Sequence, residues 1–533
     1  MQNQKIFIYD STLRDGTQGE GVSFSIDDKI KVVRALDNLG LDYIEAGNPG
    51  SNPKDMEFFR RASRLKLTHA KLCAFGSTHR IGVRPEEDSN LQALLAAGTK
   101  VVTIFGKAWD LHVREVLHAQ CAENLEIIRS TISFLKNRGK EVIFDAEHFY
   151  DGYKNNAEYA MQVLQTAAAA GADTICLCDT NGAAFPDEIS RMTEEVYRAF
   201  PDVRIGVHCH NDAGMAVAGT VTGVLAGATH FQGTMNGFGE RCGNANLCTI
   251  IPNLQLKRGY CCIPPEKLET LKATSRLIYE LANLVPDERK PYVGSMAFAH
   301  KGGMHIDAVH KNPVTFEHIN PEQVGNERRF LMSEMSGRAA VLSAIQKVDK
   351  TISRDSAETA QVLAELKRLE NEGYQFEAAE SSFELLICKI LGRYTPFFTL
   401  EQFKVLSIAP NPENEACSAI IKIMVDGKSE LTAAEGIGPV NALDRALRKA
   451  LERFYPEIGK MRLIDFKVRV LDGKSATASR IRVLIESTDG EENWSTVGVS
   501  RDILEASWLA LVDSVEYMLQ KTRGKDNNLS HKG

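Results

Sequence analysis

The sequence has no run of about 18 uninterrupted apolar residues, the length that a membrane-spanning helix needs, so we expect no membrane partner. Its N-terminal segment lacks the long apolar core of a secretory signal peptide, and we therefore expect a cytoplasmic protein. It also lacks a basic block, a zinc-finger spacing and an arginine-rich arm, and its formal net charge is −7. We accordingly expect no nucleic-acid partner.

Cysteine spacing excludes two further classes. The 11 cysteines are an odd number, and no two of them stand in a Cys-x-x-Cys pair. A disulfide framework and a thiolate zinc site both leave such regular spacings, so we expect free thiols in a reduced compartment.

The first half of the sequence repeats one pattern, in which a short β-rich run is followed by a turn and an amphipathic helical stretch. This alternation indicates parallel strands joined by right-handed crossovers. Eight such units predict a (β/α)8 TIM barrel over residues 1–262, with a doubly wound open sheet as the alternative. The predicted strands are 6–10, 42–47, 71–76, 100–106, 141–147, 174–180, 203–210 and 229–235.

Two further regions follow the predicted barrel. Residues 263–393 have mostly helical periodicity and surround a Gly- and His-rich segment at 300–321. Residues 394–521 read as a duplicated strand-strand-strand-helix unit, in which Phe403 and Phe466 begin matching strands. We expect a regulatory or assembly domain there, and a disordered polar tail over 522–533.

The stretch GVHCHNDAGMA places two histidines at the end of the seventh predicted strand. His208 and His210 face the same side of that strand, Cys209 faces away, and a helix is expected to begin near Asp212. In a TIM barrel this position is the carboxyl-terminal mouth, where active sites lie. Taken alone, the pair is better explained as two surface histidines whose hydrogen bonds are satisfied.

Residues after the first and eighth strands favour a functional site over two surface histidines. Asp15 follows the first strand in DSTLRDGTQ, and Asn244 follows the eighth in GTMNGFGERCGNANL. Strands seven, eight and one are neighbours in a closed barrel, so Asp15, His208, His210 and Asn244 can converge on a divalent Mn, Zn, Fe or Mg ion. The absence of a thiolate argues against a closed structural zinc site. Asn244 has the alternative of capping a helix.

Arg14 also lies at the predicted mouth, next to Asp15. It is either a structural ion-pair partner or a guanidinium placed where negative charge develops on a metal-bound oxygen. Glu45, at the end of the second strand in IEAGNPG, is expected to support this group and the substrate.

Two other mouth residues have no assigned partner in the sequence. Glu147 ends the fifth strand and is either a salt-bridging group or a general base, although Asp145 and His148 are close enough to take that role. Thr180, after the sixth strand, either caps a helix or binds a substrate carboxylate.

The motifs DSTLRDGTQ, HCHNDAGMAVA and GTMNGFGERCGN resemble the signatures of the 2-isopropylmalate synthase and homocitrate synthase family. This resemblance implies a metal-dependent barrel enzyme that condenses acetyl-CoA with a 2-oxo acid. PGSNPKD, DAEHFYDGYK, HKGGMHIDAV and the C-terminal strands are most similar to the branch that forms citramalate from pyruvate. The implied cofactor is divalent Mn, Mg or Zn.

The resemblance also implies roles for individual residues. Arg14 would stabilise the alkoxide, Glu147 would take part in proton transfer, and Thr180 would lie on the substrate side. His305 and Asp307 of GGMHIDAV match a pair that relatives bring over the barrel mouth. Phe316 departs from the pattern, because relatives tend to have a tyrosine there.

The C-terminal domain is expected to bind isoleucine, the end product of the pathway to which citramalate leads in this family. Gly436 and Gly438 in EGIGPVNA precede a helix whose first N–H groups could bind an amino-acid carboxylate. The alternative is a dimerisation domain without a ligand. The family implies a homodimer in either case.

Three other functions compete with this hypothesis. The first is 2-isopropylmalate synthesis from 2-oxoisovalerate, since one methylene in a pocket discriminates by only about 1–3 kcal/mol. The second is a C–C lyase or decarboxylase on the same barrel, which the duplicated C-terminal unit disfavours. The third is an amino-acid sensor without catalysis, which the four potential metal ligands disfavour.

Overall fold

The computed structural model describes residues 4–331, 338–353, 355–407, 417–471, 479–490 and 492–530. The chain forms two compact units, one of Met1–Phe298 with Ile319–Arg328 and one of Ala299–His318 with Arg329–Gly533. The first unit extends past residue 262, where the sequence predicts the barrel to end. The reason is α11 (Leu271–Leu281), which packs against α1 and buries Leu271 and Ile278 in the barrel core.

Eight parallel strands close into a barrel in sequence order, which confirms the predicted TIM fold. Closure is made by β1 and β8, whose register runs from Phe7 opposite His230 to Asp10 opposite Gly233. The strands are β1 Phe7–Asp10, β2 Tyr43–Glu45, β3 Lys71–Ser77, β4 Val101–Lys107, β5 Glu141–Glu147, β6 Thr174–Asp179, β7 Arg204–Cys209 and β8 His230–Gly233.

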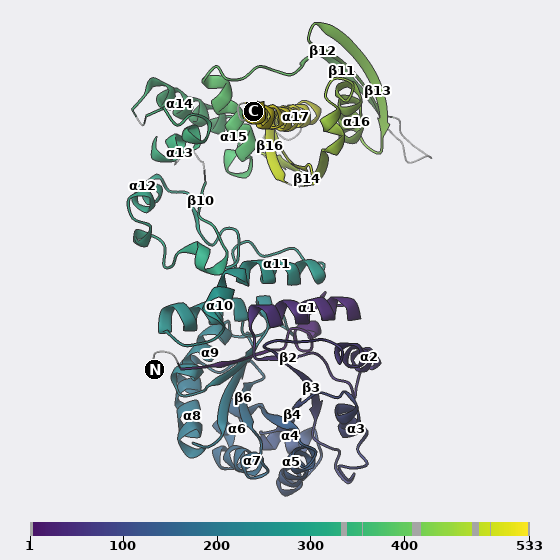
Figure 1. Cartoon of the computed structure of the whole chain (residues 1–533), viewed down its shortest axis with the longest axis vertical. Helices are drawn as coiled ribbons and strands as arrows, with labels where there is room; N and C mark the ends of the chain where they lie inside the picture. Colours follow the sequence, from purple (N-terminus) through teal and green to yellow (C-terminus); the bar gives the residue numbers. More distant parts are fainter. Residues whose placement is uncertain are drawn as a thin grey trace. The chain divides into compact units, whose positions relative to one another are not determined.

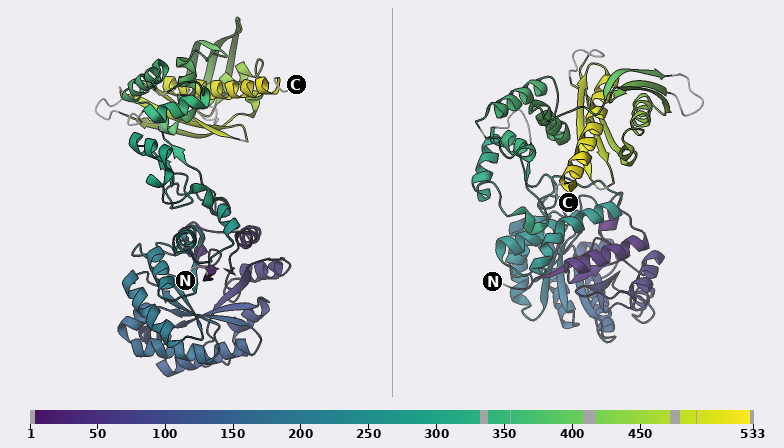
Figure 2. Two further views of the ribbon diagram at one scale, coloured as in Figure 1. Left: turned by 60° about the vertical axis from the view of Figure 1, so that its left-hand side comes forward. Right: turned by 45° about the horizontal axis from the view of Figure 1, so that its top comes forward.

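Helices surround these strands, as Figures 1 and 2 show for the purple-to-blue part of the chain. They are α1 Ile26–Leu39, α2 Pro53–Ala62, α3 Ser89–Ala96, α4 Asp110–Glu115, α5 Cys121–Lys136, α6 Phe149–Asn155, α7 Ala157–Ala169, α8 Pro186–Ala199, α9 Ala216–Leu225 and α10 Leu247–Pro252.

Helix α1 illustrates how the sequence sets each crossover. The Ser25 hydroxyl accepts a hydrogen bond from the Asp28 N–H, and the Asp28 carboxylate accepts one from the Ser25 N–H, a reciprocal cap of the kind worth about 1 kcal/mol. The helix ends at Gly40, whose φ of 92° suits glycine. Its apolar face packs into the core through Val32, Val33, Leu36 and Leu39.

Apolar side chains fill two layers of the barrel unit. The larger layer lies between strands and helices, and a smaller one inside the barrel contains Tyr9, Tyr43, Cys73, Val101 and Ile143. These side chains fill the barrel interior, so the barrel is not a channel and a ligand can approach only from an end.

The N-terminal part of the second unit is mostly helical. β9 (Ala299–His300) pairs in parallel with β10 (Arg329–Phe330). The helices are α12 Gly303–Lys311, α13 Arg338–Val348, α14 Ala357–Asn371 and α15 Glu380–Ile390.

The remainder of this unit is a duplicated βββα fold, as predicted. Each antiparallel three-stranded sheet is followed by a helix, and α17, yellow in Figure 2, lies against β15 and β16. The first copy is β11 Thr399–Ser407, β12 Cys417–Val425, β13 Lys428–Gly436 and α16 Pro439–Leu451. The second is β14 Arg462–Val470, β15 Ile481–Thr488, β16 Asn493–Ser500 and α17 Ile503–Ser530.

Local details repeat between the two copies. The Thr432 hydroxyl donates to the Ala446 carbonyl over 2.9 Å, and the Thr496 hydroxyl donates to the Ala510 carbonyl over 2.8 Å. The first strand of each sheet has an irregularity two residues after its start. Residues 522–530 continue α17 and do not form the disordered tail predicted for 522–533, while 531–533 lie outside the described residues.

Among the described residues, no helix is both long and apolar enough to cross a membrane.

Candidate metal and substrate site

Polar residues from most strands of the barrel gather at its carboxyl-terminal end. Arg14 and Asp15 lie in the loop after β1, Glu45 ends β2, and Glu147 ends β5. Thr180 follows β6, His208 lies in β7, His210 follows its last residue, and Asn244 lies in the loop after β8. The structure brings Asp15, His208 and His210 together, with Arg14 next to Asp15 and Glu45 next to Arg14.

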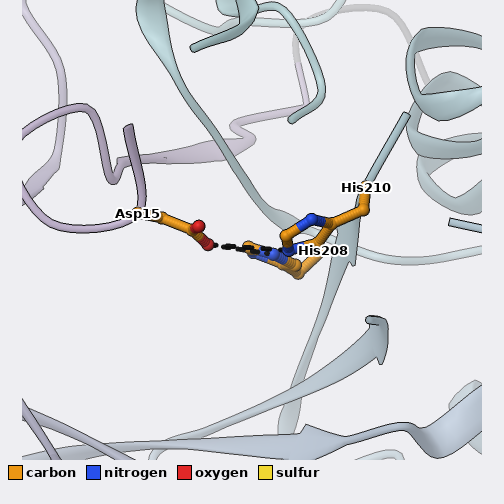
Figure 3. A group of neighbouring side chains, drawn as sticks. All are labelled: Asp15, His208 and His210. Carbon is orange, nitrogen blue, oxygen red and sulfur yellow. Dashed lines mark ion pairs between the residues drawn. The ribbon is translucent and has the colours of Figure 1, made fainter. Parts of the chain in front are cut away.

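Three buried groups face one another at the centre of this end (Figure 3). His208 Nε2 lies 3.6 Å and His210 Nε2 3.7 Å from Asp15 Oδ2. Their ligand atoms lie within 4.8 Å of one another, so one ion can contact all three. Each side chain is nearly inaccessible to solvent.

Asn244 belongs beside this trio. It forms a β-bridge with His210, and it does not cap a helix, because Asn246 is the cap of α10. Asn244 Oδ1 and Asp15 Oδ1 are both buried without a hydrogen-bond partner among the described residues. Two unpaired buried acceptors are costly unless a donor or a cation satisfies them. They fit a divalent cation.

The charge states of the trio also suit a cation. Burial raises the pKa of Asp15, but Arg14, His208 and His210 outweigh it and hold that pKa below its ordinary value. Burial lowers the pKa of His208, and burial together with His208 lowers the pKa of His210 to about 4. At neutral pH the site therefore presents one carboxylate and two neutral imidazoles, the forms that bind metals.

The other ring nitrogens of the two histidines have different neighbours. His208 Nδ1 lies 2.9 Å from Gln232 Oε1, and Gln232 Nε2 donates to Asp145 Oδ1 over 2.8 Å. His210 Nδ1 lies 3.2 Å from an Arg241 nitrogen, and Arg241 also pairs with Asp212. Nothing in the sequence indicates that Gln232 and Arg241 contact the site, because Gln232 appears there only as one residue of a predicted strand.

Arg14 is held rigidly in the site. Its Nε donates to Glu45 Oε2 over 2.6 Å, its Nη1 lies 3.3 Å from Asp15 Oδ2, and its guanidinium stacks 3.8 Å from the ring centre of Phe75. Glu45 is fully buried and accepts further bonds from Tyr9 and Ser11. Burial opposes the charge of Arg14, but Glu45 and Asp15 raise its pKa above the ordinary value.

Glu147 has a partner that the sequence did not reveal. Lys107, the last residue of β4, forms an ion pair with the Glu147 carboxylate across the two neighbouring strands. Since β4 and β5 are in register there, a Lys-to-Glu pairing is detectable only once the strand alignment is known.

Thr180 stabilises a strained turn. Its hydroxyl accepts a hydrogen bond from the His148 N–H over 2.9 Å, and His148 has a left-handed φ of 56°. The predicted cap role is wrong, because the next helix, α8, begins only at Pro186 with Phe185 before it. The helix predicted near Asp212 likewise begins later, at Ala216.

The remaining predicted residues lie in the second unit. His305 and Asp307 are on α12, where the His305 ring stacks on Phe316 at 4.1 Å and Asp307 pairs with Lys311 over 2.6 Å. Their part in the barrel chemistry stays a prediction. Gly436 ends β13 and Gly438 precedes the first residue of α16.

Comparison with known families identifies the chain. Residues 5–278 match the HMGL-like family, 292–374 the homocitrate synthase post-HMGL domain-like family, and 377–519 the LeuA allosteric (dimerisation) domain. The chain belongs to the HMGL-like family, and within it to the 2-isopropylmalate and homocitrate synthase group.

The chain is similar along nearly its full length to individual members of this group. The (R)-citramalate synthase of Synechocystis sp. is 51% identical over 97% of this chain and 96% of the relative. That of Aquifex aeolicus is 50% identical over 97% and 98% of the two chains. A probable 2-isopropylmalate synthase of Methanopyrus kandleri is 30% identical over 97% and 99%.

Proposed function

We propose that this chain condenses acetyl-CoA with pyruvate and water to give (R)-citramalate and CoA. The observation that carries the proposal is the buried Asp15, His208 and His210 trio beside a fixed Arg14, in a chain half identical to two (R)-citramalate synthases over nearly its full length. The reaction makes the enzyme an acyltransferase whose acyl group becomes an alkyl group on transfer.

A divalent Mn, Mg or Zn ion would be held by Asp15, His208 and His210, with Asn244 Oδ1 as a further oxygen donor. When bound, such an ion polarises the keto group of a 2-oxo acid. The two unpaired acceptors, Asp15 Oδ1 and Asn244 Oδ1, support this assignment.

Arg14 would stabilise the negative charge that develops on the keto oxygen as the new C–C bond forms. Its position is fixed before the substrate arrives, by Glu45 on one edge of the guanidinium and Phe75 under its face. Such a preorganised donor costs no reorganisation during the reaction.

Glu147 would accept a proton from the methyl group of acetyl-CoA, and the resulting enolate would attack the keto carbon. Its ion pair with Lys107 holds the carboxylate in place at the end of β5. Water then cleaves the thioester and releases CoA. Thr180 would bind on the substrate side, and His305 and Asp307 remain proposed partners in proton transfer.

The test is a thiol-release assay with a panel of 2-oxo acids, run with and without divalent metal. We expect CoA release that depends on pyruvate and is abolished by a chelator, with Asp15→Asn as the inactive control. Preference for 2-oxoisovalerate would instead identify a 2-isopropylmalate synthase. CoA release independent of any 2-oxo acid would contradict both.

We further propose that isoleucine inhibits the enzyme through the C-terminal domain and that the chain forms a homodimer. The match to an allosteric dimerisation domain supports both. Gly438 is the better position to test, since an added Cβ there meets open space, whereas one at Gly436 lies 2.5 Å from the Ala442 nitrogen.

Activity should be titrated with isoleucine and with leucine in the wild type, in Gly438→Ala and in Gly459→Ala. Gly459 also has room for a Cβ and serves as the matched control. A loss of isoleucine inhibition in Gly438→Ala alone supports the site. Indifference of the wild type to both amino acids contradicts it. Sedimentation of the full chain tests the dimer.

A further inference from the structure

Gln232 occupies an unusual place in the barrel. It lies in β8, it is fully buried, and its side chain sits between Asp145 of β5 and His208 of β7. β7 is the hydrogen-bonded neighbour of β8, whereas β5 lies three places from β8 in the order of the barrel. The amide therefore connects three strands through side chains alone.

The two contacts of Gln232 define the orientation of its amide in the structure, and the Asp145 carboxyl keeps an acceptor oxygen for it even when protonated. An oxygen of Asp145 lies 2.8 Å from the Gln232 nitrogen, which donates to it. The Gln232 oxygen is then the atom 2.9 Å from His208 Nδ1, and it can only accept. Consequently, the proton of the neutral His208 ring resides on Nδ1, and the lone pair of Nε2 faces Asp15.

His210 shows that this arrangement is not general. Its Nδ1 faces Arg241, which can only donate, so this contact favours the proton on Nε2. For Nε2 to bind a cation, the proton of His210 must move to Nδ1, and that move breaks the contact with Arg241. Only His208 has a neighbour that prepares its Nε2.

We infer that Gln232 is a positioning residue that presets His208 as a metal ligand, with Asp145 in turn orienting the Gln232 amide. The inference rests on the proposed metal site and deepens it. Hydrogen-bond acceptors on the far nitrogen of a ligating histidine fix its tautomer and ring orientation, and their removal typically costs about 10–100-fold in metal affinity. Here an amide takes the place that a carboxylate or carbonyl usually has.

The test measures divalent-metal affinity of the full chain by titration with Mn²⁺ or Zn²⁺ against a competing chelator. Gln232→Met keeps the length of the side chain and removes the acceptor, and we expect affinity to fall by about 10–100-fold. Gln232→Glu retains an acceptor toward His208 Nδ1, and we expect it to stay within about threefold of the wild type. Thr193→Val is the control, because it deletes a fully buried hydrogen bond to Tyr150 away from the site.

The outcomes separate this inference from the proposed function. If the wild type binds no divalent cation, the metal site itself is wrong and the role of Gln232 falls with it. If the wild type binds and Gln232→Met binds equally well, the inference alone is overturned. Should Gln232→Met fail to fold, Gln232→Glu decides, since a tenfold loss there would overturn the role of the acceptor. A loss in Thr193→Val equal to that in Gln232→Met would assign the effect to packing.

Discussion

Two buried acidic clusters lie inside the same barrel, and only one of them suits a metal. Asp15, His208 and His210 form the first, and Asp145, Cys176 and Cys178 form the second, each with its ligand atoms within 4.8 Å. They differ in charge. The first presents a carboxylate and neutral imidazoles, as described above.

In the second cluster every group is held in its protonated form. Burial and the nearby Glu45 raise the pKa of Asp145 to about 8, despite the opposing charge of Arg14. Burial raises the pKa of the Cys176 thiol well above its ordinary value and that of Cys178 to about 11. Since thiolate and carboxylate are the ligand forms, proximity alone does not make a metal site.

The largest effect is expected from removing the one carboxylate of the first cluster. Asp15→Asn takes away the negative charge that two neutral imidazoles cannot replace. We expect metal affinity to fall by more than about 100-fold, beyond the range seen when only supporting residues change, with activity lost in proportion. Titration with Mn²⁺ and the thiol-release assay measure the two losses. Retention of both in the variant would make the first cluster as inert as the second.

The second-largest effect is expected at Arg14, the cation in contact with Asp15. Arg14→Lys keeps the charge but loses the fork that contacts Glu45 and Asp15 together and the plane that stacks on Phe75. We expect kcat to fall on the order of 10²–10³, as for the loss of one oxyanion donor.

Arg204 provides the matched control for this prediction. It begins β7, at the opposite end of the barrel, and its guanidinium also stacks 3.8 Å from an aromatic ring, that of Phe7. Arg204→Lys should leave kcat near the wild-type value. Equal losses in the two variants would show that barrel packing, and not the chemistry, accounts for both.

The two aspartates should give different pH dependence of stability in the metal-free chain. Folding raises the pKa of Asp145 from 3.8 to about 8, so the folded chain holds an extra proton between these values. Its free energy of unfolding therefore falls as pH rises through this window and is level above it. Folding lowers the pKa of Asp15, so its contribution is present above about pH 4 and lost only below it.

Urea unfolding between about pH 5 and pH 8 tests this difference. Asp145→Asn should flatten the decline in stability over that window, whereas Asp15→Asn should retain most of the decline. The same slope in Asp145→Asn as in the wild type would mean that Asp145 is already ionised.

The smallest effect is expected from the thiols of the second cluster. Because Cys176 and Cys178 are protonated at neutral pH, Cys178→Ser should not change the affinity or the number of bound metal ions. Mass spectrometry under native conditions counts the ions. One ion fewer in the variant would reveal a second metal site.

The sequence was sufficient for the barrel and for the convergence of Asp15, His208, His210 and Asn244. Both follow from local signals, namely eight alternating units and polar residues directly after particular strands. All eight predicted strands exist, with ends within a few residues of those predicted.

Supporting contacts were not predictable in the same way. The Lys107–Glu147 pair and the chain from Asp145 through Gln232 to His208 depend on the relative stagger of strands, which is a property of the closed barrel. The alternative of a capping role for Asn244 could be resolved only when Asn246 was seen to cap α10. The assignment of α11 to the barrel likewise depends on which apolar face its side chains meet.

The duplicated C-terminal halves share one hydrophobic core. Buried residues of both sheets and both terminal helices form a single cluster, and the Phe403 ring of the first half lies 5.6 Å from the Trp508 ring of the second. Neither half can bury its apolar face alone, so separation near η8 (Pro456–Lys460) would expose both.

Because the two halves share this core, we expect them to unfold together in one cooperative transition. A small molecule that binds either half favours the folded state of both, because the free energy of binding is added to a single transition. A ligand of either half would therefore raise one melting temperature that both halves share.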